Sequence, residues 1–112
     1  MAEGGSTEFV TLYMTAAGSH EAASIAEALV EERLVACANV FDGVTSYFRW
    51  EGKVQAEGEV VVIAKTRASL VSAVEARLKD LHSYDVPCLV AWPIVDGHSD
   101  YLNWIAEETR DD

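Results

Sequence analysis

The chain of 112 residues suits a single domain, and half of its residues are hydrophobic, which is enough to bury a working core. Its formal net charge is −11, from 19 acidic and 8 basic residues. Binding to nucleic acid or to an anionic membrane needs clustered Lys and Arg, so this charge argues against both kinds of partner. An acidic surface attracts cations, although it serves equally well to keep a protein soluble.

The N-terminal third of the chain predicts a tail, a strand and a helix. Residues 1–8 are small, polar and Gly-rich, which predicts a disordered tail before a single domain over residues 9–112. Residues 9–15 alternate as a strand with apolar side chains on both faces, so we expect this strand in the middle of a sheet. Residues 20–34 carry an apolar stripe at helical spacing and predict the first helix.

The middle of the chain predicts a long β-hairpin. Residues 35–41 have the pattern of a strand, the Asp-Gly pair at 42–43 interrupts it as a turn or a bulge, and residues 44–50 continue it. After a Glu-Gly-Lys turn, residues 53–65 return as a third strand. Its apolar run at 60–64 implies burial on both faces, so this strand should also be central.

The C-terminal part predicts a second helix, a fourth strand and a short third helix. Residues 69–82 carry an inward apolar stripe, and residues 88–92 form a strand that Pro93 assigns to an edge or a bulge. Residues 100–109 form the last helix. Each helix is expected to begin at a side chain that can cap it: Ser19, Ser69 and either Ser99 or Asp100.

The resulting order is β-α-β-β-α-β with an extra C-terminal helix, which predicts an α+β fold of ferredoxin-like topology. In that fold the helices cover one face of the sheet and leave the other open in a single copy. The open face would carry aliphatic side chains from both central strands, which are costly to leave in water. The pattern therefore predicts association with further copies of the same chain.

The two cysteines, Cys37 and Cys88, show neither a CxxC motif nor a paired zinc-ligand spacing. The sequence shows no secretory leader pattern, and no apolar run approaches the ~18 residues of a membrane span. We therefore expect a cytoplasmic protein in which both thiols are reduced and no disulfide joins them.

Five segments, taken together in their order and spacing, resemble the CutA (divalent-cation tolerance) family. The resemblance runs from about residue 10 to about residue 105. It implies a ferredoxin-like domain, an architecture similar to the trimeric PII signalling proteins, and a homotrimer in which the β-hairpin over residues 35–66 reaches between subunits. The segments are Leu34–Val40, Ser46–Lys53, Glu59 leading to Lys65-Thr66, His82–Pro87 and Tyr101–Trp104.

The same resemblance implies binding of copper or another divalent cation. The family's ligand positions correspond here to Met14, Leu81 and His82, of which His82 keeps a ligand type. Met14 could offer a thioether to Cu(I), whereas Leu81 offers no ligand. Cys37 is a further candidate as a thiolate, with burial as a small hydrophobe as the alternative. His82 could instead be a helix C-terminal histidine that interacts with the helix dipole.

Glu59, Lys65 and Tyr84 match positions that, by the resemblance, gather near a cleft between subunits. A carboxylate, an ammonium and a phenol in one cleft could bind a small polar or anionic ligand, or could form an ion pair and hydrogen bonds within the interface. Trp50, near the hairpin tip, is expected to be buried against another subunit.

These observations predict a non-catalytic homotrimer that acts in divalent-cation tolerance. The alternative is a PII-like sensor that binds a small ligand at subunit clefts. Catalysis is not expected, because the loop at 16–19 lacks the Arg that an acylphosphatase needs for its phosphate. The same loop lacks the CxxC of a metallochaperone of this fold.

Overall fold

The computed structural model describes residues 8–111 of the chain. The elements are β2 (Phe9–Ala16), α1 (Ser19–Glu31), β3 (Cys37–Trp50), β4 (Lys53–Arg67), the 3₁₀ turn η1 (Ala68–Leu70), α2 (Val71–Leu81), β5 (Leu89–Pro93) and α3 (Ser99–Glu108). Residues 1–7, most of the predicted tail, lie outside the described residues. Glu8 is described, and its carbonyl oxygen accepts a hydrogen bond of 2.7 Å from the Ala68 amide.

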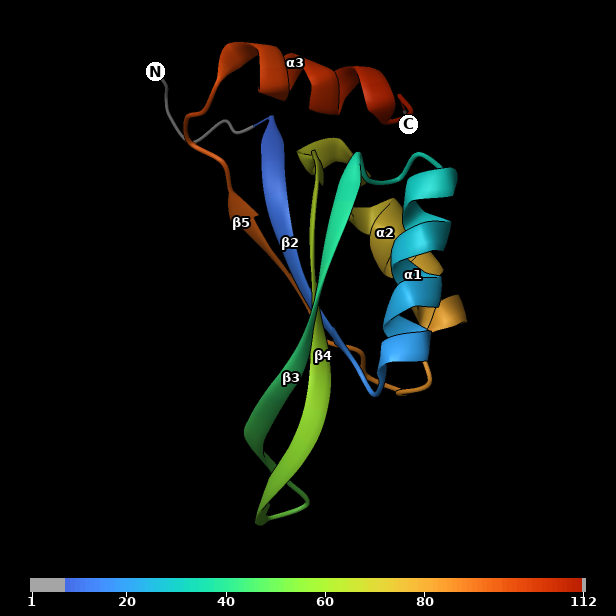
Figure 1. The fold of residues 1–112 in the computed structure, drawn as a ribbon, viewed down its shortest axis with the longest axis vertical. Helices are drawn as coiled ribbons and strands as arrows, with labels where there is room; N and C mark the ends of the chain where they lie inside the picture. Colours follow the sequence, from blue (N-terminus) through green and yellow to red (C-terminus); the bar gives the residue numbers. More distant parts are fainter. Residues whose placement is uncertain (1–7, 112) are drawn as a thin grey trace.

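The four strands form one antiparallel sheet in the order β3-β4-β2-β5 (Figure 1). The two strands predicted to be central, β2 and β4, are central. The short strand β5 lies at an edge and ends at Pro93, whose ring leaves no amide hydrogen to donate to a further strand. The element order and this sheet confirm the α+β fold of ferredoxin-like topology.

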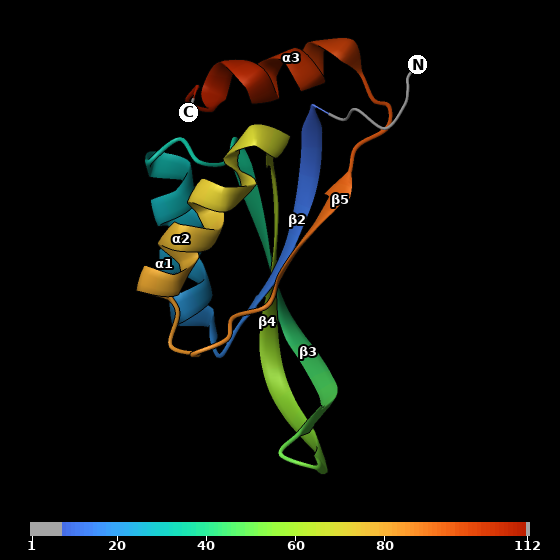
Figure 2. The ribbon, with the colours of Figure 1, turned by 180° about the vertical axis from the view of Figure 1, so that it is seen from behind.

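The core lies between the sheet and the helices α1 and α2, which cover the same face (Figures 1 and 2). Alternate residues of β2 and β4 supply its floor, since partners in the register such as Met14 and Val62 are both buried. Leu29 of α1 and Leu78 of α2 close it from above. Full burial of side chains of this size contributes roughly 1.5–3 kcal/mol each, so this face supplies the main stabilisation of the fold.

The hairpin of β3 and β4 continues beyond the rest of the sheet and ends as a separate arm (Figure 1). At its tip, Glu51 and Gly52 have φ values of 51° and 78°, the left-handed conformation of a two-residue hairpin turn. The predicted interruption at residues 42–43 is a β-bulge, because the pairing register shifts between Phe41 and Val44. Gly43 takes a φ of 79° there, which bends the arm.

The three predicted helix caps were wrong. Each helix begins after a different residue, at Gly18, at Leu70 and at His98. Ser19 lies inside α1, where its hydroxyl donates 2.7 Å to Asp42 Oδ1. Ser69 does not cap α2, because it lies within the 3₁₀ turn η1 that precedes this helix. At α3, the His98 ring accepts a hydrogen bond of 3.2 Å from the Asp100 amide and so fills the role expected of Ser99 or Asp100.

Helix α3 lies across the end of the sheet, and Arg67 at the end of β4 fixes its C-terminus (Figure 2). The guanidinium donates to the carbonyl oxygens of Ala106, Thr109 and Arg110 at 3.2, 2.8 and 3.0 Å. The last carbonyls of a helix have no partners within it, so a cation at this end satisfies them and complements the helix dipole.

We predict that Arg67→Lys destabilises the protein by about 2 kcal/mol, because lysine lacks the planar fork in which Nη2 contacts the three carbonyls while Nε donates to the Thr109 hydroxyl at 3.0 Å. Amide hydrogen exchange should accelerate first between Leu102 and Thr109. Arg49→Lys, on the exposed hairpin arm, is the control and should leave stability within about 0.5 kcal/mol of the unmodified protein. Unchanged exchange in α3 of the Arg67 variant would show that the helix is held by its apolar contacts alone.

Candidate functional site

The buried ring of His82 contacts strand β2 through one nitrogen and the turn after α2 through the other. Nε2 lies 2.7 Å from the Thr15 carbonyl oxygen, and Nδ1 lies 3.0 Å from the Tyr84 amide nitrogen. An amide nitrogen can only donate, so Nδ1 is the acceptor and the ring proton sits on Nε2, from which it is donated to Thr15. The two hydrogen bonds therefore fix the imidazole in one tautomer, in which Nε2 donates its proton and the lone pair of Nδ1 accepts.

Glu21 of α1 braces the same turn from the other side. Its Oε2 accepts 2.6 Å from the Ser83 amide, its Oε1 accepts 3.0 Å from the Ala17 amide, and Oε2 lies 3.9 Å from His82 Nδ1. Burial acts to raise the pKa of this carboxyl, but the hydrogen bonds from Ala17 and Ser83 outweigh it and lower the pKa below its usual value. The carboxylate therefore stays charged and holds the turn after α2.

Tyr84 follows that turn and donates its hydroxyl to Glu59 Oε2 of β4 at 3.0 Å. Burial, and then the hydrogen bond and the charge of Glu59, raise the pKa of Tyr84 to about 12. The phenol stays protonated and its hydrogen bond fixes the Glu59 carboxylate. Two of the three residues predicted for a cleft are thus in direct contact.

A cavity of about 680 Å³ surrounds this contact on the sheet face that α1 and α2 leave uncovered. We call it the open-face pocket. Three acidic side chains line it, together with four aromatic rings, and none of the described residues in its wall is Lys or Arg. The lining is Tyr13, Thr15, Ser46, Phe48, Trp50, Gln55, Glu57, Glu59, Tyr84, Asp85, Val86, Pro87 and Cys88.

Lys65, the third residue predicted for the cleft, lies elsewhere. It is six residues from Glu59 along the same strand, a separation of about 20 Å at the usual rise of a strand. Lys65 pairs in register with Thr11 and Cys37, toward the end of the sheet that α3 covers. Within a single chain the charged residues that line the pocket are therefore all acidic.

The three candidate metal ligands are not brought together. The Met14 side chain is 1% exposed and packs in the core on the helix-covered face. Cys37 faces the opposite side of the sheet, where its Sγ lies 3.5 Å from the Tyr101 hydroxyl, a contact that with burial raises the pKa of Tyr101 to about 12. His82 has both nitrogens bonded, and Leu81 packs against the core. In the part of the chain that the structure describes, no group of three or more His, Cys, Asp or Glu side chains is arranged to hold a metal ion.

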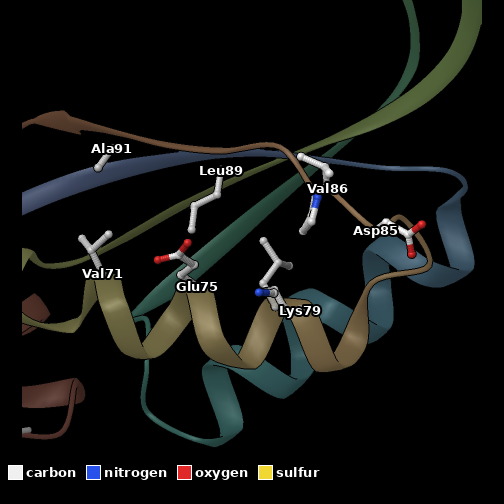
Figure 3. Close-up of a pocket in the computed structure, with 9 residues that line it drawn as sticks. Val71, Glu75, Lys79, Asp85, Val86, Leu89 and Ala91 are labelled. Carbon is white, nitrogen blue, oxygen red and sulfur yellow. The ribbon is translucent and has the colours of Figure 1, made fainter. Parts of the chain in front are cut away.

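A second, smaller hollow of about 380 Å³ lies on the other face, between α2 and β5. Figure 3 shows Glu75 and Lys79 on the helix side of it and Leu89 and Ala91 on the strand side. Residues 85–87 line both hollows and form the wall that they share. Its charged residues are Glu75, Lys79 and Asp85, and the rest of its lining is apolar.

The sequence reasoning missed Glu21, Glu57 and Asp85 as site residues. Glu57 stands two positions before Glu59 and Asp85 directly follows Tyr84, so strand alternation and adjacency could have indicated both. Glu21 acts on Ser83 at a separation of 62 residues, which no local pattern encodes.

Comparison with known proteins gives a consistent result. Residues 10–108 match the family described as CutA1 divalent ion tolerance protein. The chain is 43% identical over 96 residues to the divalent-cation tolerance protein CutA of Thermus thermophilus, covering 86% of this chain and 93% of that protein. It is 38% identical to the chloroplastic protein CutA 1 of Oryza sativa, of which it spans 58%.

The fold agrees with solved structures of such proteins. The crystal structure of CutA1 from Oryza sativa superposes with a TM-score of 0.92 at 37% identity, over 95% of this chain and 97% of that one. Among the described residues, none of the helices is both long and apolar enough to cross a bilayer.

We predict that Tyr84→Phe destabilises the protein by about 1 kcal/mol at pH 8, because Glu59 loses its hydrogen-bond donor. A phenol whose pKa is raised from its usual 10 to about 12 on folding contributes stability that is fully present below pH 10 and is lost as the pH rises toward 12. The difference in unfolding free energy between the two proteins should therefore shrink between pH 10 and pH 12.

Denaturant unfolding at a series of pH values measures this difference. The other tyrosines are present in both proteins, so their contribution to the unfolding free energy cancels in the difference. Tyr47→Phe is the matched control, since that ring is 75% exposed on the hairpin arm. A difference that stays constant from pH 8 to pH 12 would contradict the hydrogen bond from Tyr84 to Glu59.

Proposed function

Since the chain belongs to the CutA1 divalent ion tolerance family, we propose that it acts in tolerance of copper or another divalent cation as a homotrimer, without catalysing a reaction. The family match over residues 10–108 carries this proposal. The names of its relatives describe ion tolerance and state no reaction.

Self-association is supported by the uncovered face of the sheet. Phe41, Val90 and Trp92 lie there about half exposed, although each sits on a strand whose other side helps to form the core. The hairpin arm adds Trp50 and Val54, which are 55% and 67% exposed. Apolar surface spread over a face and an arm in this way marks an interface, and the family resemblance puts the number of copies at three.

We also propose a cytoplasmic location. Cys37 and Cys88 are free thiols, which is the state that a reducing compartment maintains. Relatives differ in this respect, since the rice protein is named chloroplastic and an Archaeoglobus fulgidus structure is titled periplasmic.

We predict that sedimentation equilibrium gives three times the chain mass of 12.2 kDa. Phe41→Asp should dissociate the trimer, because a carboxylate on the uncovered face would be buried without a partner. Val95→Asp is the matched control: Val95 is 89% exposed in the loop before α3, and its variant should remain trimeric. A well-folded monomer for the unmodified chain at micromolar concentration would contradict the trimer.

A bound copper ion fits the described residues poorly. The candidate ligands lie on opposite faces of the sheet, and the His82 ring can accept a metal at Nδ1 only if the Tyr84 amide gives up its hydrogen bond. We therefore propose that tolerance belongs to the protein as a whole and does not depend on a copper ion held jointly by Met14, Cys37 and His82.

From this geometry we predict that calorimetric titration with Cu²⁺, Cu⁺ and Zn²⁺ shows no tight site that depends on His82. The affinity of the His82→Ala variant should match that of His20→Ala, in which an exposed histidine of α1 is removed as the control. A stoichiometric site that is lost in the His82 variant alone would show that the turn after α2 opens to bind metal.

A second function is favoured by one observation, the open-face pocket. Its volume of about 680 Å³ is within the range of small-molecule sites, and the carboxylate of Glu59, held by Tyr84, lines it. We propose as the alternative that the protein is a PII-like module that senses a small ligand here, in a cleft that other subunits help to enclose.

A further inference from the structure

Two side-chain hydrogen bonds join the hairpin arm to the rest of the domain, one on each of its strands, at the level where the arm leaves the sheet. They run from Ser19 to Asp42 and from Tyr84 to Glu59. We propose that these two bonds form a clamp that holds the arm in the direction in which it contacts another copy. The inference rests on the homotrimer proposed above, because it concerns how one chain is prepared for assembly.

The sheet alone does not fix the direction of the arm. Strand β2 pairs with β4 as far as Val60, and beyond that level residues 44–50 and 53–59 pair with each other (Figure 1). A ribbon of two strands is only marginally stable by itself and twists more than a wider sheet. The β-bulge between Phe41 and Val44 adds a bend at the same level. Contacts at the root of the arm therefore decide where its tip points.

The first bond of the clamp holds strand β3. Ser19 is the first residue of α1, and its hydroxyl donates 2.7 Å to Oδ1 of Asp42, which lies inside the bulge. A carboxylate acceptor makes such a bond stronger than one between neutral groups. The bulge is thereby joined to the helices of the covered face.

The second bond holds strand β4. Glu59, which accepts 3.0 Å from the Tyr84 hydroxyl, pairs in register with Val44, the first residue after the bulge. Glu21 links the two bonds: it lies two residues after Ser19 in α1, and its carboxylate accepts 2.6 Å from the amide of Ser83, the residue before Tyr84. The first turn of α1 therefore supports the arm through both of its strands.

These bonds all lie within one chain, so the clamp does not depend on which surfaces other copies cover. Exclusion of water by a neighbouring copy would strengthen a hydrogen bond at the root of the arm. An arm that already points in its bound direction loses less conformational freedom on assembly, and this saving raises the affinity between copies.

The test compares the unmodified full-length protein with a variant that lacks both bonds, Ser19→Ala with Tyr84→Phe. Sedimentation equilibrium over a dilution series, in a fixed and sub-denaturing concentration of urea, gives the concentration at which half of the trimer dissociates. This concentration should rise about tenfold in the variant. Amide hydrogen exchange should accelerate at residues 44–59 at least about fivefold more than in α1 and α2.

A matched control and a rescue variant complete the design. Ser24→Ala with Tyr101→Phe removes an exposed hydroxyl of α1 and a phenol that contacts Cys37, far from the root of the arm. It should keep the half-dissociation concentration within about twofold and should not single out the arm in hydrogen exchange. Ser19→Thr retains the hydroxyl donor and should behave as the unmodified protein.

The outcomes separate the clamp from the trimer on which it rests. Equal acceleration of exchange in the arm and in the helices would show general destabilisation and would overturn the clamp. If the unmodified chain is a trimer and the double variant behaves like its control, the clamp fails and the trimer stands. If the unmodified chain is a monomer at micromolar concentration in buffer, both fail.

Discussion

The structure depends on one constraint: β2 and β4 carry apolar side chains on both faces, whereas α1 and α2 cover only one of them. On the covered face the strands and helices interlock into a closed core. On the other, rings and aliphatic groups such as Phe41 and Trp92 remain in contact with solvent in a single copy. The topology leaves this asymmetry because both crossover helices of a ferredoxin-like domain fall on the same side. The uncovered face is therefore where other copies and ligands must be sought.

The turn after α2 connects the core to that face. Glu21 and His82 fix the turn from the helix side, and Tyr84, two residues on, reaches through to Glu59 on the uncovered side. One residue that the family resemblance suggested as a metal ligand, His82, thus belongs to the same hydrogen-bonded unit as two that it suggested for a cleft, Tyr84 and Glu59. His82 contributes to the site by its position in this unit, since its bonds set where Tyr84 leaves the turn.

The elements and their order could be predicted from the sequence because three signals indicated the same structure. These were the hydrophobic periodicity, the turn residues, and the strands with apolar side chains on both faces. Pro93 identified the edge strand and the Asp-Gly pair located the bulge. The caps could not be predicted, because the apolar periodicity of a helix does not fix its first residue. A start one residue earlier, or a 3₁₀ turn before the helix, changes the capping residue and leaves that periodicity the same. Of the site, Glu59 and Tyr84 were predicted to lie near one cleft between subunits, but their direct contact within one chain was not predicted. The distance of Lys65 from them follows from strand length and from the register.

The bulge at Gly43 also bears on the solubility of the protein. Strand β3 is an edge of 14 residues in the isolated chain, and its neighbour β4 contains the uninterrupted run Val60–Ala64. A long, flat edge of this kind would template the stacking of strands that leads to amyloid-like fibrils. The extra residue and the left-handed glycine bend the edge at its midpoint, so that two such edges cannot lie straight against each other. The kink that shapes the arm thereby interrupts the flat edge along which another strand could pair.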